Sequence, residues 1–124
     1  MSNVTPIRVT GTFSPSGTQA VNIVSPIPLE ITIEAAATSI VTRVPSSITN
    51  IILVAANPLR LGLLFYNDGT ANQYIKFGTT ASLIDFTVKL TPRMFYEVAA
   101  PIYLGQVDVI SSSTNGAIQV TELT

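Results

Sequence analysis

The sequence predicts an all-β protein: an antiparallel β-sandwich, of jelly-roll or immunoglobulin-like type, with an extended N-terminal arm. Short apolar runs separated by turn residues recur about every ten residues after residue 47, a spacing typical of sandwiches and barrels. Five of the eight prolines fall within residues 1–46. Proline interrupts helices and sheet ladders, so this region is not expected to form a compact core by itself.

The N-terminal region, residues 1–46, is therefore predicted to be an arm that packs on neighbouring subunits. Residues 7–11 and 29–35 alternate with the period of two that is typical of strands. Residues 33–41 also fit a helical spacing, but their β-branched residues favour a strand. The alternative is a set of ordinary edge strands on the same domain. If the arm is correct, its subunit contacts are expected to be Ile7, Val9, Phe13, Ile27, Leu29, Ile31 and Ile33.

The body, residues 47–124, is predicted to contain a series of short strands. They are expected near residues 48–56, 61–66, 73–77, 84–90, 94–98, 105–111 and 117–123. The clearest is 84–90, where apolar and polar residues alternate throughout. The Asn-Asp-Gly at 67–69 and the Asn-Gly at 115–116 tolerate the positive φ that tight hairpins require. The expected core residues include Leu63, Phe65, Ile75, Phe86 and Val88.

The composition argues against catalysis. The chain has no His and no Cys, and only six Lys or Arg and seven Asp or Glu among 124 residues. A nucleophilic triad then lacks its usual base, and disulfides, thiolate nucleophiles and cysteinyl metal sites are excluded. Lys76 or Lys89 would have to serve a Ser–Lys dyad, and Lys89 occupies the solvent phase of a predicted strand. We expect no enzyme, no catalytic residue, no cofactor and no metal.

The carboxylates are also expected to be structural. A glycosidase needs two of them across a cleft, and the candidates are Asp68, Asp85, Glu97, Asp108 and Glu122. Asp68 falls in a predicted turn, and three of the others fall on the polar phase of predicted strands. Residues 67–72 offer oxygen ligands for calcium, but a hairpin turn explains them more simply.

Arg60 precedes an apolar strand and is expected to pair with Glu97 or Glu122, fixing a corner of the fold. The alternative is an unpaired surface arginine at a strand start. The tyrosines are expected at a core edge or an interface with their hydroxyl groups outward. The alternative is a sugar-binding platform built from Tyr66, Tyr74, Tyr96 and Tyr103.

The charge pattern also limits the partners. Net charge is −1 and the basic residues are scattered singly, so no nucleic-acid partner is expected. The most apolar run, residues 51–56, is far shorter than the roughly 20 residues that span a bilayer, and no membrane partner or signal peptide is expected. Charged residues make up 10% of the chain, against about 25% in a typical soluble domain. Burial of surface against other subunits would explain this; a neutral surface rich in Ser, Thr and Asn is the alternative.

Six motifs lie between residues 55 and 124. They are Asn-Pro-Leu-Arg-Leu-Gly at 57–62, Phe-Tyr-Asn-Asp-Gly-Thr-Ala-Asn at 65–72, Tyr-Ile-Lys-Phe-Gly at 74–78, Phe-Thr-Val-Lys-Leu at 86–90, Tyr-Glu-Val at 96–98 and Val-Thr-Glu-Leu at 120–123. Together they resemble a pattern in small β-sandwich virion proteins of tailed bacteriophages. The resemblance covers about half of the chain and implies a shared sandwich fold in a virion.

The resemblance implies a capsid decoration, or cement, protein on the capsid surface that stabilises the phage head by bridging major capsid protein subunits. Self-association is expected, and a homotrimer suits the threefold positions of an icosahedral shell. One alternative is a tail, neck or head-fibre adaptor. Another, from a different class, is a glycan-binding module.

Overall fold

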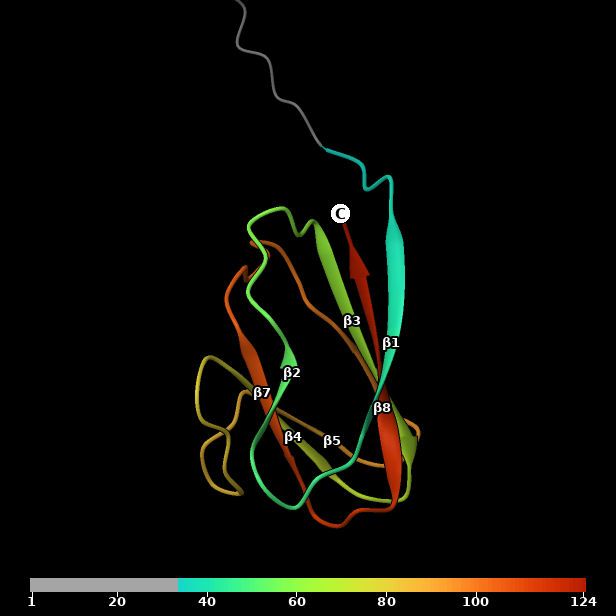
Figure 1. Cartoon of the computed structure of the whole chain (residues 1–124), viewed down its shortest axis with the longest axis vertical. Coiled ribbons are helices and arrows are strands. Elements are labelled where there is room, and N and C mark those ends of the chain that lie inside the picture. The colour runs from blue at the N-terminus through green and yellow to red at the C-terminus, as the bar shows by residue number, and fades with distance from the viewer. Residues whose placement is uncertain (1–33) are drawn as a thin grey trace, which may run out of the picture. The chain divides into compact units, whose positions relative to one another are not determined.

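The computed structural model describes residues 34–124, and within them the chain forms eight strands and no helix (Figure 1). The predicted contact residues Ile7, Val9, Phe13, Ile27, Leu29, Ile31 and Ile33 lie outside the described residues. The strands are β1 (Ser39–Pro45), β2 (Ile51–Val54), β3 (Gly62–Gly69), β4 (Gln73–Phe77), β5 (Val88–Leu90), β6 (Phe95–Glu97), β7 (Val107–Ser111) and β8 (Gly116–Leu123).

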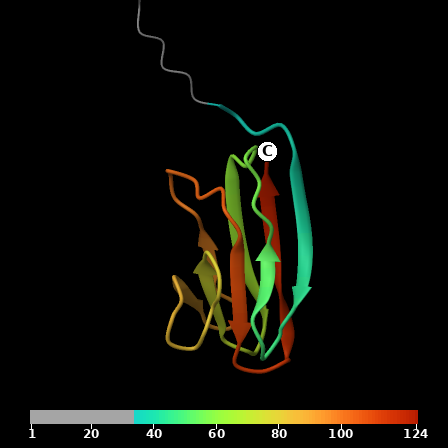
Figure 2. The same ribbon diagram turned by 60° about the vertical axis from the view of Figure 1, so that its left-hand side comes forward.

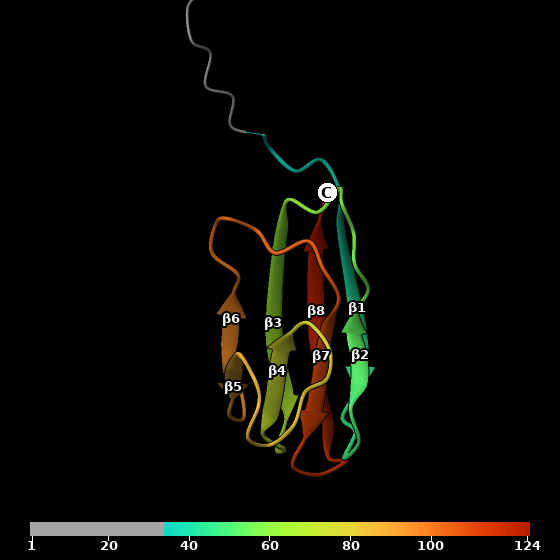
Figure 3. The same cartoon turned by 90° about the vertical axis from the view of Figure 1, so that its left-hand side faces the viewer.

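The strands form two four-stranded sheets. We call the sheet with strand order β1-β8-β3-β6 sheet A and the sheet with order β2-β7-β4-β5 sheet B. All the paired strands run antiparallel. Figures 2 and 3 show the sheets as two layers, with β1 and β2 along one side and β5 and β6 along the other. The predicted all-β antiparallel sandwich is therefore confirmed.

The strand order is that of a jelly roll. β1 pairs with β8, β2 with β7, β3 with β6 and β4 with β5, as in one long hairpin of eight strands. The hairpin folds over so that β8 also pairs with β3 and β7 with β4, which joins the strands into two sheets. Of the two sandwich types that the sequence left open, this topology is the jelly roll, with its two Greek keys.

The core lies between the sheets and is built from alternate residues of each strand. In β3, Leu63 and Phe65 point inward and are buried, whereas Leu64 and Tyr66 point outward. Burial of such side chains contributes about 1.5–3 kcal/mol each. Leu63, Phe65 and Ile75 are core residues as predicted. The buried apolar cluster is Leu53, Leu63, Phe65, Ile75, Leu90, Val98, Val107, Val109, Ile118 and Val120.

The predicted strand at 84–90 is wrong over its first half. Only Val88–Leu90 forms a strand, β5, and Ile84 is 94% exposed. The Ser82 hydroxyl accepts hydrogen bonds from the amides of Ile84 and Asp85 and holds a local turn that breaks the ladder. Phe86 is exposed and is not a core residue, while Val88 packs at the core edge. Alternation by itself cannot distinguish a strand from a loop that crosses a sheet face.

The body of the sandwich begins earlier than predicted. Residues up to 46 were predicted to belong to the arm, but β1 pairs with β8 along its whole length, from Ser39 opposite Leu123 to Pro45 opposite Ala117. The unit that contains the sandwich is Glu34–Thr124. Pro45 does not prevent this pairing because it is the last residue of an edge strand, a position where proline is tolerated.

Two buried amide side chains fix the loops. Gln73 donates from Nε2 to the Ser46 hydroxyl at 2.8 Å and accepts from the Ser111 hydroxyl, joining the end of β1 to sheet B. Asn67 donates from Nδ2 to the carbonyls of Ala71 at 2.7 Å and Leu90 at 2.9 Å. The expected turn at 67–69 is therefore the end of β3, and the chain reverses only after it.

Arg60 is the charged residue that fixes a corner of the fold, and it is 2% exposed. Its Nε donates to Glu122 Oε2 at 2.8 Å, and Glu122 lies near the C-terminal end of strand β8. Its Nη1 donates to the carbonyls of Tyr103 and Gly105 at 2.7 and 3.1 Å, and its Nη2 to the carbonyl of Ala55 at 2.6 Å.

Of the two partners expected for Arg60, Glu122 is the one observed. Glu97 lies exposed in β6, opposite Leu64. Two non-regular segments, around Ala55 and at 103–105, are held to β8 by one guanidinium group. An arginine suits this position because its planar group carries five donors in fixed directions.

Replacing Arg60 with Ala is expected to lower the free energy of unfolding by about 3–5 kcal/mol, because it leaves a partly buried carboxylate and several carbonyls without donors. Urea denaturation followed by circular dichroism measures the change. Arg93→Ala is the control: its ion pair with Asp68 is exposed, and such pairs contribute about 0–1 kcal/mol. Equal losses in the two variants would contradict the structural role of Arg60.

Candidate functional site

The outer face of sheet A is the candidate functional site, and strand register determines which residues share it. One row across β1, β8, β3 and β6 consists of Arg43, Gln119, Tyr66 and Phe95. The next row consists of Val41, Thr121, Leu64 and Glu97. Directly opposed residues of antiparallel strands point to the same side, so these eight side chains form one continuous surface.

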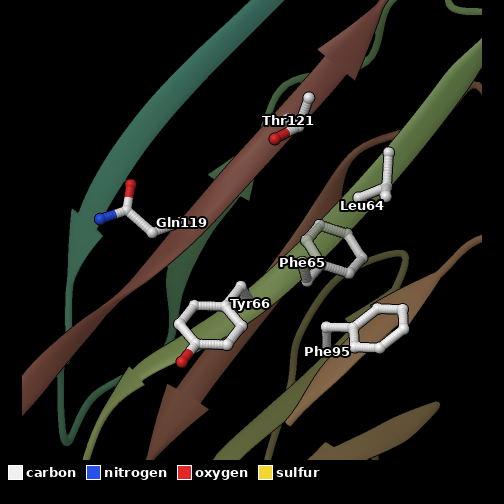
Figure 4. Close-up of a pocket in the computed structure, with 6 residues that line it drawn as sticks. All are labelled: Leu64, Phe65, Tyr66, Phe95, Gln119 and Thr121. Carbon is white, nitrogen blue, oxygen red and sulfur yellow. The ribbon is translucent and has the colours of Figure 1, made fainter. Parts of the chain in front are cut away.

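The centre of this face is apolar and slightly hollowed. Phe95 is 66% exposed, and its ring lies beside that of Tyr66 on the neighbouring strand (Figure 4). A hollow of about 220 Å³ lies here, lined by Leu64, Phe65, Tyr66, Phe95, Gln119 and Thr121. We call Leu64, Tyr66, Phe95, Gln119 and Thr121 the aromatic patch. Its rings offer surfaces for stacking, and Gln119 and Thr121 offer hydrogen-bonding groups.

Charged groups lie at the margins of the face. Asp68, at the end of β3, accepts a hydrogen bond from Gln119 Nε2 at 3.2 Å. Its carboxylate lies 3.9 Å from Arg43 Nε and 3.6 Å from Arg93 Nη1. These pairs are exposed and contribute little to stability. An apolar centre with a polar margin is the arrangement found in protein–protein interfaces.

The outer face of sheet B, by contrast, is partly covered by a loop of the same chain. Residues 79–87 fold over it, and Lys76 of β4 pairs with Asp85 at 2.5 Å. The ring of Phe86 packs edge-on against Tyr74 with ring centroids 5.1 Å apart. The amide of Thr87 donates to the carbonyl of Ile75 at 2.7 Å. The two sheets therefore differ: the outer face of sheet B is partly covered by this loop, whereas residues 34–124 leave the outer face of sheet A open.

Asp108 was expected to face solvent, because it lies on the polar side of its strand. Its side chain points to the outer side of sheet B, but the loop covers it, so it is buried. It accepts hydrogen bonds from Asn50 Nδ2 at 3.0 Å and Gln106 Nε2 at 2.8 Å. Asn50 in turn accepts from the amide of Ala81 at 2.7 Å, so the carboxylate helps to anchor the loop.

Three of the other carboxylates expected to be structural form ion pairs. Glu122 binds Arg60, Asp85 binds Lys76, and Asp68 lies between two arginines. Glu97 is exposed and forms no ion pair within residues 34–124. Among residues 34–124, no group of three or more acidic, His or Cys side chains could hold a metal ion. In the segment of the calcium alternative, residues 67–72, Asn67 Nδ2 donates to the Ala71 carbonyl, whereas Asn67 Oδ1 is buried without a hydrogen-bond partner among the described residues.

The four tyrosines do not form one platform. Tyr66 lies on the outer face of sheet A, and Tyr74 lies under Phe86 on sheet B. Tyr103 stacks on Phe77 with ring centroids 5.2 Å apart, and Tyr96 packs at the core edge opposite Phe65. Phe95, the neighbour of Tyr66, was not predicted from the sequence. The alternation of β3 predicts that Leu64 and Tyr66 face outward, but only the β3–β6 register brings Phe95 beside them.

Comparison of the chain with models of known protein families, with curated proteins and with solved structures gave no match. The resemblance to phage virion proteins therefore stays an expectation from the sequence motifs. Within the described part of the chain, no helix has the length and apolar character to cross a membrane.

The aromatic patch is expected to be dispensable for folding. Phe95→Ser should change the free energy of unfolding by less than about 0.5 kcal/mol, since the side chain is mostly exposed. Phe65 lies on the neighbouring strand β3 and its ring is buried in the core. Phe65→Ala should therefore lower the free energy of unfolding by about 3–5 kcal/mol. Urea unfolding of both variants measures the difference. A large loss for Phe95→Ser would mean that the patch is part of the fold and not a binding surface.

Proposed function

We propose that this protein is a structural virion protein: a capsid decoration, or cement, protein that stabilises a phage head by bridging major capsid protein subunits. It acts through surface contacts at the capsid surface, without catalysis, a cofactor, a nucleic-acid partner or a membrane partner. The observation that carries the proposal is the open outer face of sheet A, with the aromatic patch at its centre. The proposal includes self-association, and the homotrimer expected from the N-terminal arm remains a prediction because that segment lies outside the described residues.

Two further observations support this reading. The jelly-roll topology is common in viral capsid proteins, although the same fold also serves lectins and cupins, so this support is an analogy at the level of the fold. The motifs quoted from residues 55–124 fall on the strands and turns of this sandwich, including the Tyr66 segment of the open face. If that face contacts the capsid, the Tyr66 segment that carries the resemblance would lie against the shell.

The energetics suit a cement protein. An aromatic side chain buries about 150–250 Å² when it is fully covered, and buried apolar surface contributes about 25 cal/mol per Å². Two rings and Leu64 therefore supply several kcal/mol before the entropy of association is subtracted. A weak contact of this size becomes effective when one oligomer engages several capsid subunits at once.

The copy number in virions tests the location. A decoration protein should be present in on the order of hundreds of copies per particle, whereas a tail, neck or head-fibre adaptor should be present in about a dozen, as the symmetry of each position dictates. Gel densitometry of purified virions against the major capsid band measures the ratio. A ratio near the low value would replace the capsid proposal with the adaptor.

The contact face is tested with two matched variants. Tyr66→Ser combined with Phe95→Ser should weaken binding to capsids that lack the protein by at least about tenfold, because both rings lose their contact with the shell. Ile84→Ser removes an equally apolar exposed side chain from the loop over sheet B and should leave binding unchanged. Co-sedimentation with the capsids measures both. Unchanged binding of the double variant would refute the proposed face.

Glycan binding is the second candidate, and the pair of neighbouring rings beside the Gln119 amide favours it (Figure 4). Sugar rings stack on aromatic faces while amides bind their hydroxyl groups. A glycan array probed with the purified protein tests it: specific signals that disappear with Tyr66→Ser and persist with Ile84→Ser would support this function. A blank array together with capsid binding would leave the decoration protein.

A further inference from the structure

The four sheet edges of the sandwich are not equally protected against pairing with another strand. A free edge presents unpaired amides and carbonyls, and proteins protect edges by shortness, bulges, charges or proline. β5 and β6 have 3 residues each, and β2 has 4 residues with a register shift between Ile52 and Val54. β1 has 7 residues paired to β8 without any shift. Figures 1 and 2 show β1 at the margin of sheet A with no other described strand beyond it.

The hydrogen bonds to β8 identify the backbone groups that the edge presents. Thr38 and Thr124 exchange amide-to-carbonyl bonds, both at 2.9 Å, so they form a hydrogen-bonded pair. Hydrogen-bonded pairs alternate with non-hydrogen-bonded pairs in an antiparallel ladder. The next bonded residues of β1 are then Ile40, Thr42 and Val44. The amides and carbonyls of the residues between them, Ser39, Val41 and Arg43, therefore point to the open edge.

The side chains of β1 are also uncovered. Ile40 is 58% exposed and Val41 is 61% exposed, although they point to opposite faces of the sheet. A regular strand with exposed β-branched residues on both faces is suited to the middle of a sheet and not to its margin. Of the protective devices, it carries only Arg43 and the terminal Pro45.

We infer that β1 pairs with β1 of a second copy, in an antiparallel arrangement about a two-fold axis at Thr42, which joins two A sheets into one eight-stranded sheet. This register pairs Ser39–Pro45 of both copies along its full length. Ile40 then faces Val44 of the second copy, an apolar pair, and Thr42 faces Thr42. Val41 and Arg43 of opposite copies exchange both backbone hydrogen bonds. The proline at the strand end removes a single donor on each side.

Strand length and charge together favour this register. The strand carries one charged residue, Arg43, and the axis at Thr42 sets each arginine opposite a valine. An axis at Arg43 would set the two arginines opposite each other, and an axis at Val41 would pair only residues 39–43 of the strand. Like charges directly opposed on paired strands are destabilising. The nearby Asp68 carboxylate, 3.9 Å from Arg43 Nε, moderates the charge further. The pairing uses β1 alone, so it is a two-fold contact separate from the homotrimer contacts expected of the N-terminal arm, and it does not rest on the proposed function.

Cysteine cross-linking of the full-length protein tests the axis, because the chain has no natural Cys. In the inferred dimer the Thr42 residues form a non-hydrogen-bonded pair with Cα atoms about 4.5 Å apart, within the range for a disulfide. Thr42→Cys should become a covalent dimer under mild oxidant. Thr114→Cys, exposed in the loop between β7 and β8, should form no covalent dimer under the same conditions. A segment other than β1 on this edge would leave Thr42→Cys without the covalent dimer, and that result overturns the inference.

A second pair of variants tests the register through charge. Val41→Lys sets lysine opposite Arg43 at two symmetric positions and should raise the dimer dissociation constant about tenfold. Val41→Glu sets a carboxylate there and should leave the constant unchanged or lower it. Sedimentation equilibrium measures both, with circular dichroism as a check of folding. Equal dissociation constants for Val41→Lys and Val41→Glu would overturn the inferred register.

Discussion

The hydrogen bonds from the Arg60 guanidinium to four oxygen atoms are the constraint on which one end of the sandwich depends, the end where β8 finishes. The β strands need only alternation and hydrogen bonding to form, but the segments that connect the two sheets around Ala55 and at 103–105 are irregular. Their carbonyls would be left unpaired inside the protein without a donor. A single buried side chain supplies the donors and ties these segments to Glu122 in β8. Asn67 in β3 and Gln73 in β4 act in a similar way, because their side chains bond to the Ala71 carbonyl and the Ser46 hydroxyl, which lie outside the strands.

The sequence was informative where one strand determines its own structure. Alternation in β3 gives the inward positions of Leu63 and Phe65. Pairing of Arg60 with a carboxylate was one of two interpretations that the sequence left open, and the structure shows the pair with Glu122. The sequence was uninformative where two distant segments must meet. Residues 84–87 alternate as well as any strand, yet they cross the face of sheet B because the Ser82 turn and the Lys76–Asp85 pair hold them there. The burial of Asp108 could not be predicted for the same reason, because the loop that covers it comes from a distant part of the sequence.

The candidate site follows the same rule. Tyr66 could be singled out from its sequence as an amphipathic ring, but its neighbours Phe95 and Gln119 come from strands that are 29 and 53 residues away along the chain, as their positions 95 and 119 against 66 show. A surface patch on a sheet is a property of register, and register is a long-range quantity. Once the jelly-roll pairing is known, the outer face follows from the alternation of each strand. The asymmetry between a covered sheet B and an open sheet A then directs attention to one side of the molecule.

The position of β1 beside the chain end has a mechanical consequence. The amides of Ala37 and Thr38 donate to the carbonyl of Thr124, at 2.8 and 2.9 Å, so β1 enters the sandwich at the end where β8 leaves it. A force that pulls Glu34 and Thr124 apart would load these bonds first and then each pair of the β1–β8 ladder in turn. Bonds that are loaded one at a time unzip at a low force, whereas bonds loaded together in shear resist a much higher one. A sandwich built in this way withstands tension poorly when it is held at residues 34 and 124, and well when the load is spread over the faces of its sheets.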